Sequence, residues 1–146
     1  MQFPFMKKLA IIFILITLYS CSHKKDSNQN LITKNDAIKT LENFYIALGT
    51  SDTTLLRQTV TSDFYMFEHD EEWNLDNLLE LMPSTMGRKW SLNDIQFESD
   101  REIGHITYLN KGVIPSDRSW LESALLVLEH EEVKIKFLHS TKLYLQ

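Results

Sequence analysis

The hydrophobic pattern of this chain changes period once, and that change constrains the fold more than any other feature. Over most of the stretch from Thr33 to Pro83, apolar residues recur three and four positions apart, which predicts amphipathic helices. From Lys89 onward, apolar and polar residues alternate with a period of two, which predicts long strands. Helices followed by a run of strands indicate an α+β domain.

Three helices are expected before the long strands. Each begins at a polar side chain that can cap its first turn, and the first and third end at a glycine and a proline. A short strand over residues 63–68 and a polar turn over residues 69–72 separate the second helix from the third. The bounding residues are Thr33 and Gly49 for the first helix, Ser51 or Asp52 for the start of the second, and Asn74 and Pro83 for the third.

Four long strands are expected in the second half. The apolar face of the first changes phase near residues 93–94, which predicts a β-bulge. The second covers residues 103–109, after which Asn110 begins a turn. The third, over residues 120–128, is apolar on both faces and is therefore expected to be covered on both. The last strand alternates through residues 133–144.

This order of elements resembles the nuclear transport factor 2-like (SnoaL-like) fold over roughly residues 33–146. Two segments carry the resemblance: TSDFYMFEHDEEWNLDNLLELM at residues 61–82, and SWLESALLVLEHEEVKIKFLHSTKLYL at residues 119–145, which is similar to the closing hairpin of the family. The resemblance implies a cone-shaped domain, in which three N-terminal helices pack on a curved, mostly antiparallel sheet.

The same resemblance implies an expectation about partners, but it does not select a function. Members of the family often form homodimers through the outer face of the sheet, which would here cover Leu121, Leu125 and Val127. The family includes isomerases, cyclases, dehydratases, binding subunits and inert scaffolds. The fold therefore leaves the activity open.

The N-terminus has the pattern of an export signal. Lys7 and Lys8 precede an apolar run over residues 9–18, which is too short to cross a bilayer that needs about 20 residues. Such a run suits the hydrophobic region of a cleaved secretory signal. Met6 directly precedes the two lysines, so translation begins either at Met1 or at Met6.

The only cysteine of the chain lies at the end of this signal, in the sequence Leu18-Tyr19-Ser20-Cys21. This segment resembles the lipobox of bacterial lipoproteins, apart from the bulky Tyr19. The resemblance implies cleavage before Cys21, acylation of that cysteine with palmitate-like chains, and a place in the bacterial cell envelope, facing the periplasm or the cell exterior. Two or three acyl chains hold a protein at a membrane durably, because each buried methylene contributes about 0.8 kcal/mol.

Three regions are thus expected: a signal peptide at 1–20, a lipidated cysteine with a polar tether at 21–32, and the folded domain at 33–146. Removing residues 1–20 takes away two lysines and no acid, which leaves 13 basic and 20 acidic side chains and a net charge of −7. Such a chain has no electrostatic reason to bind nucleic acid or an anionic bilayer. Association with the membrane is therefore expected to come from the lipid alone.

An isomerase-type site needs a carboxylate base and hydroxyl donors in an apolar cavity. In family members of that kind, the tyrosine comes from the first helix and the base from the first strand. Tyr45 lies on the apolar stripe of the first helix, Glu68 ends the first strand, and Glu122 is the only acid among the apolar strand cores. The alternative interpretation, which we favour, gives Tyr45 a packing role and leaves Glu68 in solvent.

Further candidates come from the strands. His139 lies on the expected apolar face of the last strand and is interpreted as a general base, a ligand contact or a hydrogen-bonded core residue. Trp90 and Trp120 either line a pocket or fill the core. His69, His105 and His139 do not have the spacing of metal ligands, so neither a metal nor a cofactor is expected.

Three functions remain open from the sequence. The first is a lipid-anchored ligand-binding or accessory protein, the second an enzyme that acts on a small apolar carbonyl compound, and the third a structural, dimerising subunit. A cavity in which Tyr45, His139 and a carboxylate converge would favour catalysis. A filled interior would favour the structural role, and an open cavity without convergent polar groups would favour binding.

Overall fold

The computed structural model describes residues 31–116 and 118–144. The expected signal peptide, Cys21 and most of the tether lie outside these residues. Ile32 was expected in the tether, but its side chain is only 1% exposed and its N–H donates a hydrogen bond to the Arg101 carbonyl. The folded domain therefore includes at least one residue before Thr33. Among the described residues, no helix has the length and apolar character needed to span a membrane.

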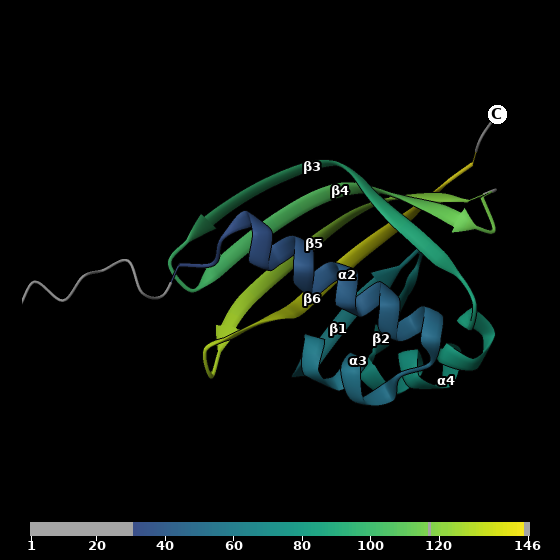
Figure 1. Ribbon diagram of the computed structural model, residues 1–146, viewed down its shortest axis with the longest axis horizontal. Coiled ribbons are helices and arrows are strands. Elements are labelled where there is room, and N and C mark those ends of the chain that lie inside the picture. Colours follow the sequence, from purple (N-terminus) through teal and green to yellow (C-terminus); the bar gives the residue numbers. More distant parts are fainter. Residues whose placement is uncertain (1–30, 117, 145–146) are drawn as a thin grey trace, which may run out of the picture.

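Two helices begin the described fold. Helix α2 covers Lys34–Thr50, and Thr33 caps it in a reciprocal pair of hydrogen bonds with Asp36, as the sequence predicts. Helix α3 covers Thr53–Thr59 and is capped by Asp52, one of the two expected residues. The helices pack against each other on the concave side of the sheet (Figure 1).

The expectation that Gly49 follows the end of the first helix is wrong. Helix α2 continues to Thr50, and Ser51 adopts the left-handed conformation with a φ of 57°. Gly49 is required for a different reason, because a Cβ atom there would lie 2.4 Å from the Arg88 carbonyl oxygen. The glycine thus lets the segment around Arg88 pass directly against α2.

A small hairpin and a third helix follow. Strands β1 (Val60–Glu68) and β2 (Glu71–Asn74) pair antiparallel, and helix α4 (Leu75–Thr85) begins at the expected cap, Asn74. The expected stop at Pro83 is wrong, since α4 continues for two more residues. A proline in the last turn removes only one helical hydrogen bond. The Thr85 hydroxyl donates hydrogen bonds to the Met82 and Leu48 carbonyls and so ties the end of α4 to α2.

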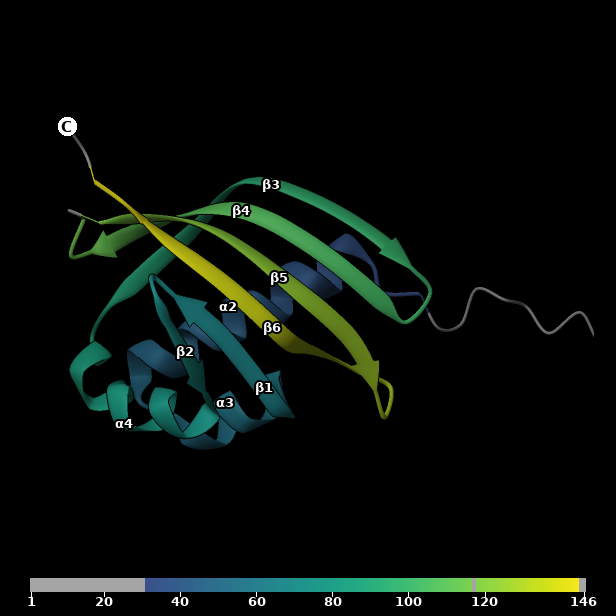
Figure 2. The same ribbon diagram turned by 180° about the vertical axis from the view of Figure 1, so that it is seen from behind.

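The four remaining strands complete a six-stranded sheet in the order β2-β1-β6-β5-β4-β3. Strands β1 and β6 are parallel, and every other neighbouring pair is antiparallel. The sheet curves around α2, and no helix lies in front of β4, β5 and β6 when the molecule is seen from behind (Figures 1 and 2). The later strands are β3 (Lys89–Asp100), β4 (Ile103–Ile114), β5 (Ser119–Glu129) and β6 (Glu132–Leu143).

One predicted irregularity is confirmed and two features of the strands differ from expectation. The register of β3 and β4 shifts after Asn93, and Asp94 has a φ of 52°, as expected for the predicted bulge. The expected turn at Asn110 is wrong, because β4 continues to Ile114 and Asn110 is 1% exposed. Asn110 lies two residues beyond Tyr108 and four beyond Ile106, so all three point into the concave side of the sheet.

The expected placement of His139 on the inner face of the last strand is also wrong. Leu125 of β5 pairs with Phe137 and Leu126 pairs with Ile135, so Lys136 is an extra residue in β6. Beyond this bulge the inner positions are Leu138 and Ser140, both buried. A shift of one residue turns every later side chain to the opposite face, which leaves His139 exposed on the outer face.

Candidate functional site

Opposite residues on three neighbouring strands bring polar groups together on the inner face of the sheet. Glu122 of β5 pairs with Tyr108 of β4 on one side and with Ser140 of β6 on the other. Glu68, at the end of β1, pairs in turn with Ser140. Helix α2 crosses this row and adds Tyr45, which stands on the apolar stripe of the helix but ends in a hydroxyl.

The Glu122 carboxyl group is held by hydrogen bonds at both oxygens. The Tyr45 hydroxyl donates to Oε2, and the Ser140 hydroxyl donates to Oε1 over 3.1 Å. The hydroxyl oxygens of Tyr45 and Tyr108 lie 3.0 Å apart, within hydrogen-bonding distance. All four of these side chains are buried, and Glu122 is 7% exposed.

Burial also changes the acidity of the cluster. Removal from water raises the pKa of Glu122 from 4.5 to about 7, although hydrogen bonds from Tyr45, Tyr108, Asn110 and Ser140 act in the opposite direction. Desolvation and the nearby Glu122 charge hold the pKa values of Tyr45 and Tyr108 well above 10. Both phenols therefore keep their protons near neutral pH, while the carboxyl group is divided between its two forms.

Tyr45, Glu122 and Ser140 of this cluster line a cavity of about 310 Å³ between the helices and the sheet. Asn110 also lines the cavity, and its Oδ1 is buried and has no hydrogen-bond partner among the described residues. The walls are mainly aromatic and aliphatic, and the half-exposed or exposed lining residues include three cations. The lining apart from the cluster consists of Phe44, Leu48, Met66, Glu68, His69, Trp73, Leu78, Leu81, Thr85, Arg88, Trp90, Arg118, Trp120, Leu138 and Lys142.

Local structure positions the walls. The Gly87 N–H donates to the Gly49 carbonyl over 2.7 Å, and the Arg88 N–H donates to the Thr85 carbonyl over 3.0 Å. These contacts hold the start of β3 against α2, where the rings of Tyr45 and Trp90 lie 5.4 Å apart. The wall beside Tyr45 thus depends on the close approach that Gly49 permits.

The structure places most of the sequence-predicted candidates around this cavity. Tyr45 and Glu122 are in direct contact, and Trp90 and Trp120 are half-buried wall residues. Glu68 also lines the cavity, where its carboxylate lies 3.7 Å from the His69 ring.

His139 is not brought to this site. Its ring lies 6.2 Å from that of Phe67 on the outer face of the sheet, in a row of exposed and half-exposed aromatic side chains. A shallow hollow on that face includes His139 together with Thr107 and Thr141. His139 is therefore separated by the sheet from the interior that it was expected to line.

Sequence reasoning missed three members of the cluster: Tyr108, Asn110 and Ser140. Strand alternation could have found the first two, because Tyr108 and Asn110 lie two and four residues after Ile106 in β4 and so face the same side of the sheet. Ser140 could not be assigned in this way, because the bulge in β6 turns the side chains of all later residues to the opposite face of the sheet.

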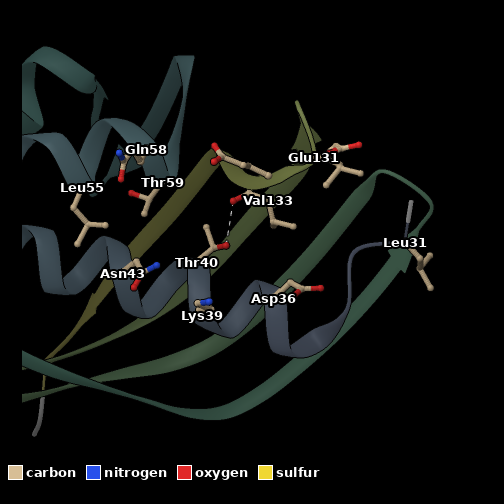
Figure 3. Close-up of a pocket in the computed structure, with 12 residues that line it drawn as sticks. Leu31, Asp36, Lys39, Thr40, Asn43, Leu55, Gln58, Thr59, Glu131 and Val133 are labelled. Atoms are coloured by element: carbon tan, nitrogen blue, oxygen red, sulfur yellow. Dashed lines mark hydrogen bonds between the residues drawn. The ribbon is translucent and has the colours of Figure 1, made fainter. Parts of the chain in front are cut away.

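A second hollow shows by contrast what makes the first one a candidate site. It has a volume of about 510 Å³ and lies between α2, α3 and the hairpin that joins β5 to β6 (Figure 3). Its charged side chains, among them Asp36, Lys39 and Glu131, are exposed, and its buried Thr40 hydroxyl already donates to the Val133 carbonyl. Among the described residues, this polar groove therefore offers no buried group that lacks a partner.

The described part of the chain contains no recognisable metal site. No group of three or more histidine, cysteine, aspartate or glutamate side chains is arranged there to hold an ion. The site is accordingly described by its hydrogen-bonding and acid–base groups.

Comparisons with known proteins show the fold. No family model and no curated protein matches the sequence. Among solved structures, an NTF2-like protein from Cytophaga hutchinsonii is 12% identical with a TM-score of 0.65, and the match covers 77% of this chain and all of that one. A putative ketosteroid isomerase from Shewanella frigidimarina is 18% identical with a TM-score of 0.62, over 74% of this chain and 96% of the other.

The association domain of CaMKII from C. elegans is also similar, at 9% identity and a TM-score of 0.65, over 74% of this chain and 94% of that domain. At these levels of identity the likeness concerns architecture alone. Residues 31–116 and 118–144 thus have the NTF2-like fold, built from a six-stranded mixed sheet and the helices on its concave face.

Proposed function

We propose that this chain is a ligand-binding or accessory protein of the bacterial cell envelope, anchored through Cys21, and that the interior cavity is its ligand site. The observation that carries the binding role is the unpartnered, buried Oδ1 of Asn110 beside the Glu122 cluster. A cavity that combines apolar walls with a few convergent polar groups is the usual form of a small-molecule site. A purely structural interior would be expected to fill this space.

Binding can be tested by comparing two tryptophan substitutions in the full-length chain. Leu81 lines the cavity, whereas Leu55 lines the polar groove of Figure 3, and both are half-buried. Untargeted mass spectrometry of co-purifying small molecules is expected to find compounds with the wild type and Leu55→Trp that are lost from Leu81→Trp. Identical compounds in all three preparations would argue against the cavity as the site.

The anchor rests on the sequence, since Cys21 lies outside the described residues. Labelled palmitate is expected to be incorporated into the wild-type chain and not into Cys21→Ser. Equal incorporation into both chains, or into neither, would contradict lipidation at Cys21 and with it the proposed location in the cell envelope.

Acid–base catalysis on a small apolar carbonyl compound is a second candidate, and Glu122 supports it. A carboxyl group with a pKa of about 7, next to the Tyr45 hydroxyl, can accept and return a proton near neutral pH. The test is deuterium exchange at the α-carbon of cyclohexanone in D₂O, followed by NMR. The rate of exchange above that in buffer is expected to fall about 100-fold or more in Glu122→Gln, with Glu132→Gln, in the polar groove, as the control. Equal rates in all three proteins would exclude this role.

The outer face of the sheet supports a third proposal, pairing with a second copy of the chain. Leu121 is 54% exposed and Ile103 is 53% exposed on this face, where the rings of Tyr65 and Phe67 on β1 are also partly exposed. Exposed apolar surface of this kind is typical of interaction sites. Sedimentation velocity is expected to show a dimer that Leu121→Lys dissociates, and a wild type that remains monomeric at high concentration would contradict the pairing.

A further inference from the structure

We propose that the cavity binds a small carboxylic acid with a planar, aromatic-sized body, oriented with a hydroxyl or amino donor toward Asn110 and its carboxylate among Arg88, Arg118 and Lys142. This inference rests on the proposed binding function and adds the chemical class of the ligand. It follows from three parts of the cavity lining that differ in position and chemistry, and Asn110 on β4 and Lys142 on β6 lie on either side of Trp120.

The part of the lining at Asn110 requires a donor. Hydrogen bonding from Asn110 to the Glu122 carboxyl uses the amide N–H group, which leaves Oδ1 as a buried acceptor without a partner among the described residues. A buried acceptor without a partner costs about 1–3 kcal/mol, and a ligand hydroxyl or amino group would recover much of that cost. A ligand with only apolar atoms at this end would leave the cost in place.

The middle of the cavity suits a planar body. Tyr45 and Trp90 form one wall, with ring centroids 5.4 Å apart, and Trp73 and Trp120 contribute to the rest of the lining. The volume of about 310 Å³ is at the lower end of the range for ligand pockets. These dimensions favour a single ring with a short side chain over a lipid or a steroid-sized molecule.

The cationic part of the lining requires an anion. Arg88, Arg118 and Lys142 line the cavity and are all half-exposed or exposed, in a domain whose other charges are predominantly acidic. Neither Arg88 nor Lys142 forms an ion pair with another described residue, and Lys142 instead lies over the Tyr144 ring at 5.4 Å. The acid at this end is Glu68, which lies 3.7 Å from His69. Arg88 and Lys142 against this carboxylate favour a negatively charged ligand group.

The ligand class can be tested by calorimetric titration of the full-length chain with three matched probes. They are 3-(4-hydroxyphenyl)propionate, which carries both groups, 3-phenylpropionate, which lacks the donor, and tyramine, in which an ammonium group replaces the carboxylate. We expect the hydroxy acid to bind at least tenfold more tightly than either of the others, which corresponds to about 1.4 kcal/mol for each missing interaction.

Variants assign each group of the ligand to its end of the cavity. Lys142→Gln is expected to weaken both acids about three- to tenfold, whereas Lys39→Gln, in the polar groove, is the matched control and is expected to change neither. Asn110→Leu is expected to abolish the preference for the hydroxy acid over 3-phenylpropionate. Because Asn110 is buried, its thermal unfolding is measured as well, and the surface variant Lys142→Gln keeps the test decisive if Asn110→Leu does not fold.

The outcomes separate this inference from the binding function. Tight binding of tyramine or of both acids equally, lost in Leu81→Trp, would overturn the proposed ligand class and leave the cavity as a binding site. Failure of all three probes would also overturn the ligand class, while the co-purification experiment decides the binding function independently.

Discussion

The two ends of the cone are built on the same strands but from different chemistry. At the closed end, neighbouring positions on β4, β5 and β6 are filled by Ile106, Ala124 and Leu138, all essentially unexposed. Two residues along each strand, the equivalent positions are Tyr108, Glu122 and Ser140, followed by the cavity. The inner face thus changes from apolar to polar in one step across three strands.

The difference indicates that the two ends serve different purposes. Apolar burial stabilises the closed end by roughly 25 cal/mol for each Å² removed from water. Burying a carboxyl group costs free energy even when it is hydrogen-bonded, and well-packed apolar residues in its place often stabilise a protein. The open end is therefore expected to reduce stability, which points to a role in binding or chemistry. Four predictions test this contrast.

The largest effect is expected at the closed end. Leu126 is fully buried, so Leu126→Ala is expected to lower the free energy of unfolding by about 3–5 kcal/mol through lost apolar contacts and the cavity left behind. Denaturation in urea measures the change, with the half-exposed Leu125 of the same strand replaced by alanine as the control. A loss below about 1 kcal/mol would show that the closed end is not the stabilising core.

At the open end, Glu122→Gln is expected to stabilise the protein at high pH. The pKa of Glu122 is about 7 in the folded state and 4.5 when unperturbed, so the folded form holds its proton more tightly. The wild type therefore loses stability relative to the variant as the pH rises from about 4.5 to 7. The difference is expected to be near zero at pH 4 and on the order of 3 kcal/mol at pH 8.

Unfolding of both proteins in urea at several pH values tests this prediction, and Glu68→Gln, on the less buried carboxylate of the same row, serves as the control. A difference that does not change with pH would mean that Glu122 is not perturbed by burial. In that case the open end would impose no electrostatic cost on folding.

Between these two ends, Gly49→Ala tests how the wall of the cavity is built. Alanine normally stabilises a helix relative to glycine by about 1 kcal/mol, but here its Cβ would lie 2.4 Å from the Arg88 carbonyl oxygen. The substitution is expected to destabilise the protein by about 1–3 kcal/mol, because the start of β3 must move away from α2. Urea denaturation measures the stability and tryptophan fluorescence the displacement of Trp90. A stabilised variant would contradict the tight contact.

Much of the architecture could be predicted from the sequence because helix caps and hydrophobic period are local signals. Thr33, Asp52 and Asn74 cap the three helices as expected, and the bulge near Asn93 is visible as a change of phase. Gly49 was misassigned because its role depends on Arg88, which is distant in sequence. A glycine near the end of a helical stripe looks the same whether it caps the helix or admits a neighbour.

The candidate site was predictable only in part for a related reason. Tyr45 and Glu122 are conspicuous as polar groups within apolar patterns, and both belong to the cluster. Asn110 resembles a turn residue in sequence, and only the continued pairing of β4 with β5 shows that it points inward. His139 was misplaced because the extra residue, Lys136, leaves no clear mark in a strand that alternates throughout.

The smallest effect is expected on the outer face, one residue away from Glu122, whose pKa is raised by burial. Leu121 precedes Glu122 in β5, but it points away from the cavity and is 54% exposed. In the monomer, Leu121→Ser is expected to change the free energy of unfolding by no more than about 0.5 kcal/mol and to leave its pH dependence unaltered. Measured beside Glu122→Gln at dilute concentration, it separates the two faces of one strand. A larger loss at low concentration would mean that the outer face is packed within the monomer, and the contrast would then lie between the two ends of the cone alone.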